Sequence, residues 1–147
     1  MKSLLSMFLC LFSLNIAFAS QGDHDHADEN FPEDALLILE GADAIDQTEC
    51  FLFVLETGFN GSASSQNYYL KVQSSYVHGT EASPAFVLTK HSKNADTYMG
   101  TTGQDSLAVV FKSNSIDPRE IKQFSIRWLH GSHYHTNRCQ DLKPHQH

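Results

Sequence analysis

Short apolar runs alternate with polar, glycine- and proline-containing breaks along most of this chain. No stretch keeps apolar residues at helical spacing over three turns, so the pattern predicts strands. A series of short strands separated by turn residues is typical of an all-β sandwich or barrel. We predict a single-domain antiparallel β-sandwich, or a barrel-like relative, of about seven to eight strands. The expected strands are Ala35–Glu40, Cys50–Thr57, Tyr68–His78, Ala85–Thr89, Leu107–Lys112 and Phe124–His130, with weaker ones at Asp96–Met99 and His133–Arg138.

The alternation also indicates which face of a strand is buried. In "FSIRWLH", Ile126 and Trp128 face one way and Arg127 the other, and His130 continues the apolar set. In "YYLKVQSSYVH" the same phase carries His78 at the end of the inward-facing residues. Side chains of a strand alternate between its two faces, so both imidazoles should lie near the rim of the packed layer. By contrast, "CFLFVLET" is apolar on both faces, which predicts a strand covered on both sides.

One short helical connection is expected before the Phe124–His130 strand. In "IDPREIKQF", Asp117 is a good N-cap, Pro118 suits the first helical position, and Glu120 follows three residues after the cap. This capping pattern predicts a single helical turn.

The first nineteen residues have the pattern of an export signal. Lys2 gives a positive start, an apolar run extends from Leu4 to Ile16, and Ala17-Phe18-Ala19 is a small-x-small cleavage pattern. No later stretch approaches the roughly 18 apolar residues that a membrane span needs. We expect cleavage after Ala19 and export to the periplasm or the extracellular space.

The remainder of the chain divides into an arm, a domain and a tail. Residues 20–34 are polar and acidic and should form a flexible arm. Residues 35–140 should form the β-domain, and residues 141–147 a histidine-containing tail. The chain has 10 Lys+Arg against 17 Asp+Glu and a formal net charge of −7. Because no basic stripe is present, nucleic acid is excluded as a partner.

Three cysteines are present, and Cys10 lies within the signal peptide. Two cysteines in an exported chain favour one disulfide, Cys50 to Cys139. The alternative is two free thiols, with Cys139 available as a metal ligand.

Nine histidines are the main oddity of the composition. In "HGSHYH", His133 and His135 share a face if the segment is extended, and His130 or His78 could supply a further ligand from a neighbouring position. Nitrogen-rich ligation favours Zn²⁺, Cu²⁺ or Ni²⁺ over Ca²⁺ or Mg²⁺. The alternatives are a strand rim whose histidines bond to backbone carbonyls, and a pH-responsive surface.

Two further histidine tracts lie near the ends of the chain. His24 and His26 belong to the acidic arm, and His145 and His147 belong to the tail. Such tracts capture metal loosely without a formed cavity. The alternative is that they only keep the tails solvated.

The sequence contains no catalytic pattern that we can identify. Gly-x-Ser-x-Gly, His-Glu-x-x-His and glycine-rich phosphate loops are missing, and the pair Asp43 and Asp46 fits a loop that enters the Cys50 strand. We therefore expect a non-catalytic exported binding module whose partner is a metal ion or another protein. The alternatives are a structural or interaction protein of the envelope or extracellular space, and metal-dependent catalysis, which would need a general base.

Overall fold

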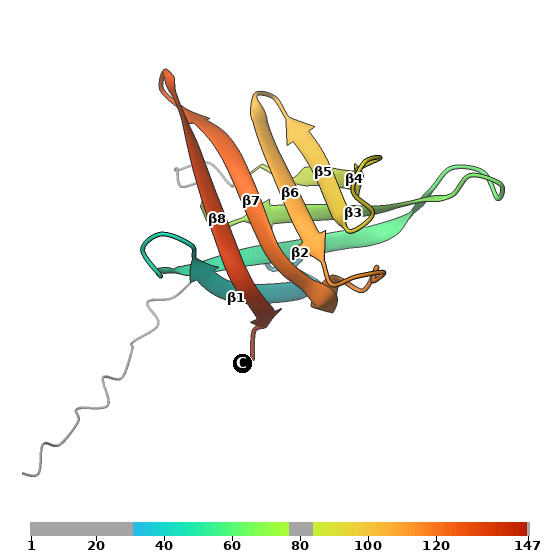
Figure 1. Cartoon of the computed structure of the whole chain (residues 1–147), viewed down its shortest axis with the longest axis horizontal. Helices are drawn as coiled ribbons and strands as arrows, with labels where there is room; N and C mark the ends of the chain where they lie inside the picture. Colours follow the sequence, from blue (N-terminus) through green and yellow to red (C-terminus); the bar gives the residue numbers. More distant parts are fainter. Residues whose placement is uncertain (1–30, 77–83, 147) are drawn as a thin grey trace, which may run out of the picture.

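The computed structural model describes residues 31–76 and 84–146. Eight antiparallel strands follow one another, and the first also pairs with the last, so that one sheet closes into a barrel (Figure 1). The strands are β1 Leu37–Asp43, β2 Glu49–Asn60, β3 Asn67–Ser74, β4 Phe86–Lys90, β5 Thr97–Thr102, β6 Asp105–Phe111, β7 Ile121–His130 and β8 His133–Pro144. The predicted all-β class is confirmed. Of the two arrangements left open by the sequence, the structure shows the barrel.

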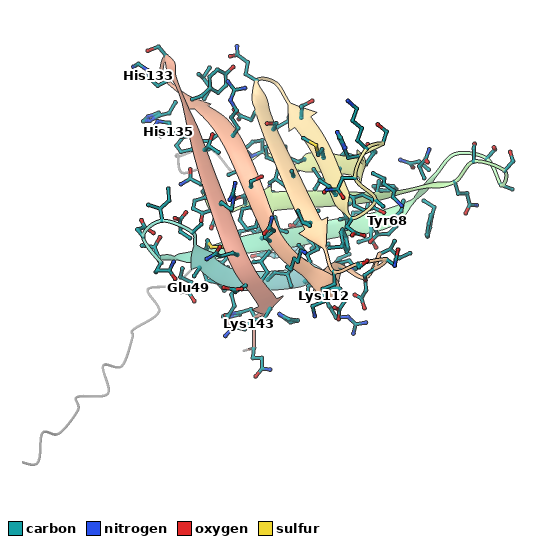
Figure 2. All side chains as sticks on the ribbon, viewed as in Figure 1. Glu49, Tyr68, Lys112, His133, His135 and Lys143 are labelled. Carbon is teal, nitrogen blue, oxygen red and sulfur yellow. A yellow bond between two sulfur atoms is a disulfide. The ribbon has the colours of Figure 1, made fainter. Side chains whose placement is uncertain are left out.

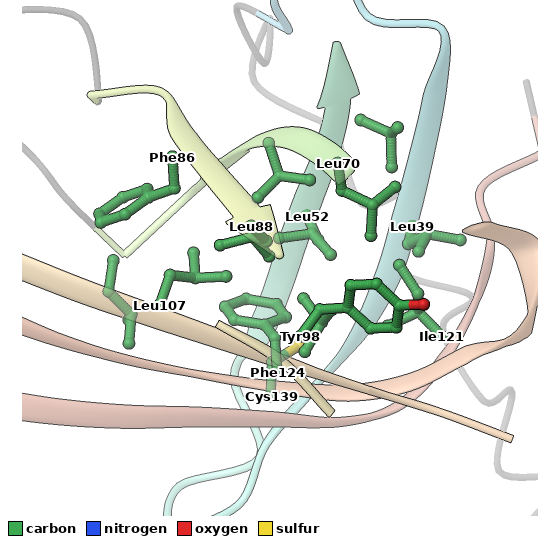
Figure 3. Close-up of a cluster of buried hydrophobic side chains, with 14 of the residues drawn as sticks. Leu39, Leu52, Leu70, Phe86, Leu88, Tyr98, Leu107, Ile121, Phe124 and Cys139 are labelled. Carbon is green, nitrogen blue, oxygen red and sulfur yellow. The ribbon is translucent and has the colours of Figure 1, made fainter. Parts of the chain in front are cut away.

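Side chains fill the interior of the barrel, as expected for one with eight strands. Every strand contributes alternate residues: Leu70, Val72 and Ser74 of β3 are fully buried, while Lys71 and Gln73 between them are partly exposed. Figure 3 shows aromatic and aliphatic side chains from opposite walls meeting in one cluster. The large buried residues are Leu39, Leu52, Leu70, Phe86, Leu88, Leu107, Phe111, Ile121, Phe124 and Ile126.

Strand β2 is covered on both faces, as its doubly apolar pattern predicts. Leu52 belongs to the core cluster, while Phe51 and Phe53 belong to the opposite set of alternating positions and are still only 5% and 8% exposed. The Phe31 ring packs on both, with centroid separations of 5.3 and 5.7 Å. The His145 ring packs on Phe51 at 5.9 Å. Residues from near both ends of the described chain therefore close over β2.

The Cys50–Cys139 disulfide is confirmed and ties β2 to β8 across β1. Both cysteines are fully buried, and their Cα atoms are 6.1 Å apart. Gly41 of β1 pairs with Cys50, and a Cβ atom at Gly41 would lie 2.5 Å from the Gln140 carbonyl oxygen and 3.0 Å from the Cys139 sulfur. The bridge can cross here because position 41 has no side chain.

Strand β8 runs past Asp141, where we expected the tail to begin, and ends at Pro144. The register between β1 and β8 shifts between Glu40 and Ala42, and Asp141 takes a left-handed conformation with φ 58°. This bulge absorbs one residue and lets Leu142 pack against the core cluster. A bulge has no reliable pattern in one sequence, which is why the boundary was misplaced.

The predicted helical connection is a single 3₁₀ turn, Pro118–Glu120. The Asp117 carboxylate accepts a hydrogen bond from the Arg119 backbone N–H at 3.0 Å, as an N-cap should. Glu120 does not fold back onto the cap. Its carboxylate instead pairs with Lys112 at 2.7 Å, which joins the turn to the end of β6.

Candidate binding site at the barrel rim

The β7–β8 hairpin projects beyond its neighbours at one end of the barrel (Figure 1). The residues of β7 that pair with β6 extend as far as Arg127, and the residues of β8 that pair with β1 begin at Cys139. Beyond these points β7 and β8 pair with each other as far as His130 and His133. The tip turns through Gly131, whose φ is 62°, a conformation that glycine adopts without strain.

The register gathers the histidines of the hairpin on one face. His135 lies opposite Trp128, and His133 lies opposite His130. Facing residues of an antiparallel pair share a side of the sheet, so all four continue the inward-facing row of Ile126. Figure 2 shows His133 and His135 near the tip of β8. The shared face expected from the sequence is therefore what the structure has, and the three histidines are exposed.

Three of these rings form a compact group. The Trp128 ring centroid lies 4.9 Å from that of His135 and 5.7 Å from that of His130, with interplanar angles of 25° and 26°. The two imidazole centroids lie 5.8 Å apart. If the imidazoles sandwiched the indole, their separation would be nearly twice that value. They therefore gather on the same side of Trp128.

The imidazole separation suits two ligands of one ion. With metal–nitrogen bonds of about 2.1 Å and tetrahedral angles, two coordinated rings have centroids about 5 Å apart. The centroids of His130 and His135, at 5.8 Å, would have to approach each other by less than about 1 Å to reach that separation. Within the described part of the chain, no group of three or more His, Cys, Asp or Glu side chains is arranged to hold a metal ion. His133 would have to turn toward the pair, and His78 lies outside the described residues.

Of the four histidines in the two terminal tracts, the structure describes His145. His24, His26 and His147 lie outside the described residues. The His145 side chain is only 15% exposed, its Nδ1 contacts the Glu40 carboxylate, and its ring packs on Phe31 at 5.5 Å. A histidine that captures metal loosely would be surrounded by solvent, whereas the His145 side chain is largely covered. In this structure the His145 ring packs on Phe51 of β2.

A pocket of about 350 Å³ opens at the same end of the barrel. The strand ends and turns that meet there contribute Asp43, Asp46, Thr48, Glu49, Phe51, Ser75, Tyr76, Trp128 and Asn137. We had no reason from the sequence to join these residues, because they come from β1, the β1–β2 turn, β2, β7, β8 and the segment after β3. Trp128 was predicted to face the same way as His130, and the pair Asp43 and Asp46 was assigned to a loop.

A hydrogen-bond network lines one side of this pocket. The Tyr76 hydroxyl donates to Asp43 Oδ2 at 2.6 Å, and the Ile45 backbone N–H donates to Asp43 Oδ1 at 2.7 Å. The Trp128 indole N–H donates to Asn137 Oδ1 at 3.0 Å. The hydrogen bond from Tyr76, followed by that from Ile45, holds the pKa of Asp43 below its ordinary value against the opposing effect of burial. Burial and the Asp43 charge raise the pKa of Tyr76. Asp43, although only 3% exposed, is therefore ionised at neutral pH.

Neither sequence nor structure comparison assigns this chain to a group of known proteins. Family models, curated proteins and solved structures were compared, and none matches. Among the residues that the structure describes, no helix is long and apolar enough to cross a membrane.

Proposed function

We propose that this protein is an exported, non-catalytic binding module that takes up a divalent transition metal ion through His130 and His135. His133 would serve as a third ligand after a side-chain rotation, and Zn²⁺ or Cu²⁺ fits the nitrogen donors best. The observation that carries the proposal is the 5.8 Å separation of the His130 and His135 rings on one face of the hairpin. The disulfide and the signal-like pattern of residues 1–19 support export.

The position of the histidines favours a site that exchanges its ion readily. The hairpin tip is exposed, so water can occupy the coordination positions that the protein leaves open. Neutral imidazole is the form that binds a metal, so protons compete with the ion for the same nitrogen atoms. Binding should therefore weaken on acidification. We expect a site that binds and releases metal ions in rapid exchange with the surrounding solution.

Native mass spectrometry on the mature protein, Ser20 to His147, tests this proposal. The starting protein carries His24, His26 and His147 changed to alanine, which removes the outer terminal histidines and leaves His145 packed on β2. We expect one Zn²⁺ or Cu²⁺ ion to remain bound, and the change of His130 and His135 to alanine to abolish it. His91→Ala, which removes a histidine that follows β4, is the matched control and should keep the ion.

Two results would contradict the metal proposal. One is an ion that persists after both His130 and His135 are changed. The other is a protein that never holds an ion although its thermal unfolding shows that it is folded. In the second case the alternative of an interaction protein without a metal site would stand.

A further inference from the structure

The pocket at the barrel rim combines negative charge with aromatic walls. Its titratable carboxyl groups are Asp43, Asp46 and Glu49, and the side chains of Tyr76 and Trp128 lie beside them. At about 350 Å³ it falls within the size range of small-molecule sites. The three carboxylates and the six strand or turn segments that supply the lining make this a built cavity at the mouth of the barrel.

The charge of this pocket has no basic partner in its own lining. Every lysine and arginine of the chain except Lys2 lies in the described residues, and none of them lines the pocket. Asp43 in particular is buried and receives its hydrogen bonds from neutral groups, the Tyr76 hydroxyl and the Ile45 backbone N–H. A buried carboxylate is normally paired with a cation or strongly hydrogen-bonded. The field of Asp43 thus adds to the attraction of the pocket for a positive charge.

The acids nearer to solvent are the ones that a ligand could reach. Asp46 and Glu49 are both exposed. Asp46 Oδ1 accepts from the Thr48 backbone N–H at 2.9 Å and from its hydroxyl at 2.6 Å, which fixes the carboxylate at the turn between β1 and β2. Glu49 begins β2, and Figure 2 labels it at the end of the barrel where this turn lies.

The geometry favours an organic cation over a bare metal ion. A metal needs several donors that converge on one point, and no three acidic or histidine side chains of the described residues do so. The two Asp43 oxygens are also occupied by other donors. An ammonium or guanidinium group spreads its charge and its donors over a larger volume, and its face or methylene stem can contact an indole ring.

We propose that this pocket binds a small organic cation, an amine or a guanidinium, whose charge lies between Asp46 and Glu49 and whose body contacts Trp128. Both this site and the imidazoles of the hairpin adjoin Trp128, but the carboxylates of the pocket are not among the proposed metal ligands, and cation binding does not depend on a metal ion. The same chemistry is available from a free amine or from the arginine side chain of a partner protein.

The single tryptophan of the chain makes binding directly observable. Trp128 fluorescence and calorimetry of the mature protein would be followed at low salt with three probes. Agmatine represents a free guanidinium, the peptide acetyl-Gly-Arg-Gly-amide represents a protein side chain, and acetyl-Gly-citrulline-Gly-amide is its neutral counterpart. We expect saturable one-to-one binding of at least one cation, and at least about tenfold weaker binding of the citrulline peptide. Binding of agmatine alone would indicate a free small-molecule cation, and binding of the arginine peptide alone would indicate the side chain of a partner protein.

Two sets of variants test whether the ligand binds in this pocket. Asp46→Asn with Glu49→Gln should weaken binding about five- to tenfold, whereas Glu120→Gln, the same charge change beside the 3₁₀ turn, should leave it unchanged. Glu49→Gln alone changes one exposed side chain and preserves the test if the double variant unfolds.

Four outcomes would overturn the proposal. The first is no saturable binding of either cation below about 10 mM. The second is equal affinity for the citrulline peptide. The third is binding that survives the loss of both acids, and the fourth is tight Ca²⁺ binding that displaces the organic cation.

Discussion

Removal of the Tyr76 hydroxyl should destabilise the protein by an amount that depends on pH. In the native barrel this hydroxyl donates to the buried Asp43 carboxylate at 2.6 Å, and the Tyr76 ring packs on Phe124 at a centroid distance of 5.7 Å. Tyr76→Phe keeps the ring and removes one donor from an ionised, buried group. A hydrogen bond to a charged group contributes about 1.5–3 kcal/mol, so we expect a loss of that size at neutral pH.

The sign of the pH dependence follows from the Asp43 pKa. Its folded-state pKa lies below the ordinary value of 3.8, chiefly because of the hydrogen bond from Tyr76. A lowered pKa contributes stability that is present above the unfolded value and is lost as the pH falls through the folded value. Tyr76→Phe raises the folded pKa toward 3.8, so the variant should differ most from the parent well above that pH. Only below the folded pKa of the parent is Asp43 protonated in both proteins, and there the difference should shrink to about 1 kcal/mol.

Urea unfolding at neutral pH and at the lowest pH at which the parent stays folded measures both differences. Tyr69→Phe is the matched control, because the Tyr69 hydroxyl also donates to a carboxylate, that of Glu56, at 2.6 Å but in an exposed position. We expect the control to be close to neutral at both pH values. An equal loss in the two variants, or a loss for Tyr76→Phe that grows on acidification, would refute the account of the Asp43 network.

Two further predictions concern the closure of the barrel. Because Cys50 and Cys139 are 89 positions apart, replacing both with alanine should lower the free energy of unfolding by up to about 4–5 kcal/mol in the chain-entropy model; urea unfolding measures this, and a free-thiol assay on the unreduced parent should find no reactive thiol. The Glu40 pKa is lowered from 4.5 mainly by the hydrogen bond with His145, and burial opposes this. Glu40 therefore stabilises the fold above pH 4.5, and His145→Ala should cost about 1 kcal/mol there and progressively less on acidification; a loss that is the same at every pH would show that only ring packing was removed.

Much of the fold could be predicted because the barrel obeys a local rule. Period-two alternation identified the buried row of β3, placed Trp128 and His130 on the inner side of their strand, and placed His133 and His135 on one shared face. Asp117 as an N-cap and Pro118 at the first helical position predicted the helical turn. The two cysteines indicated a bridge between two distant segments. Each of these signals lies within a few residues or in a count of one residue type.

The features that escaped prediction depend on distant pairing. The pairing of β1 with β8 makes the sheet a closed barrel instead of a sandwich. Neither strand has a sequence pattern that indicates its partner, so the sequence could not predict this pairing. Asp43 is hydrogen-bonded to Tyr76, which lies 33 positions away in the sequence. Nothing near Asp43 indicates this partner, so its segment was predicted to be a polar loop instead of a buried strand end. Phe31 and His145 were assigned to an arm and a tail because nothing near them in the sequence shows that β2 needs a cover.

A copper titration followed by Trp128 fluorescence tests the central claim most directly. The His135 ring lies 4.9 Å from the indole centroid, so an ion held by the hairpin should quench the single tryptophan. The mature protein with His24, His26 and His147 changed to alanine should show saturable quenching at one equivalent of Cu²⁺. Further replacement of His130 and His135 by alanine should abolish it. Weak, unsaturable quenching that is the same in both proteins would contradict the assignment of the hairpin as a metal site.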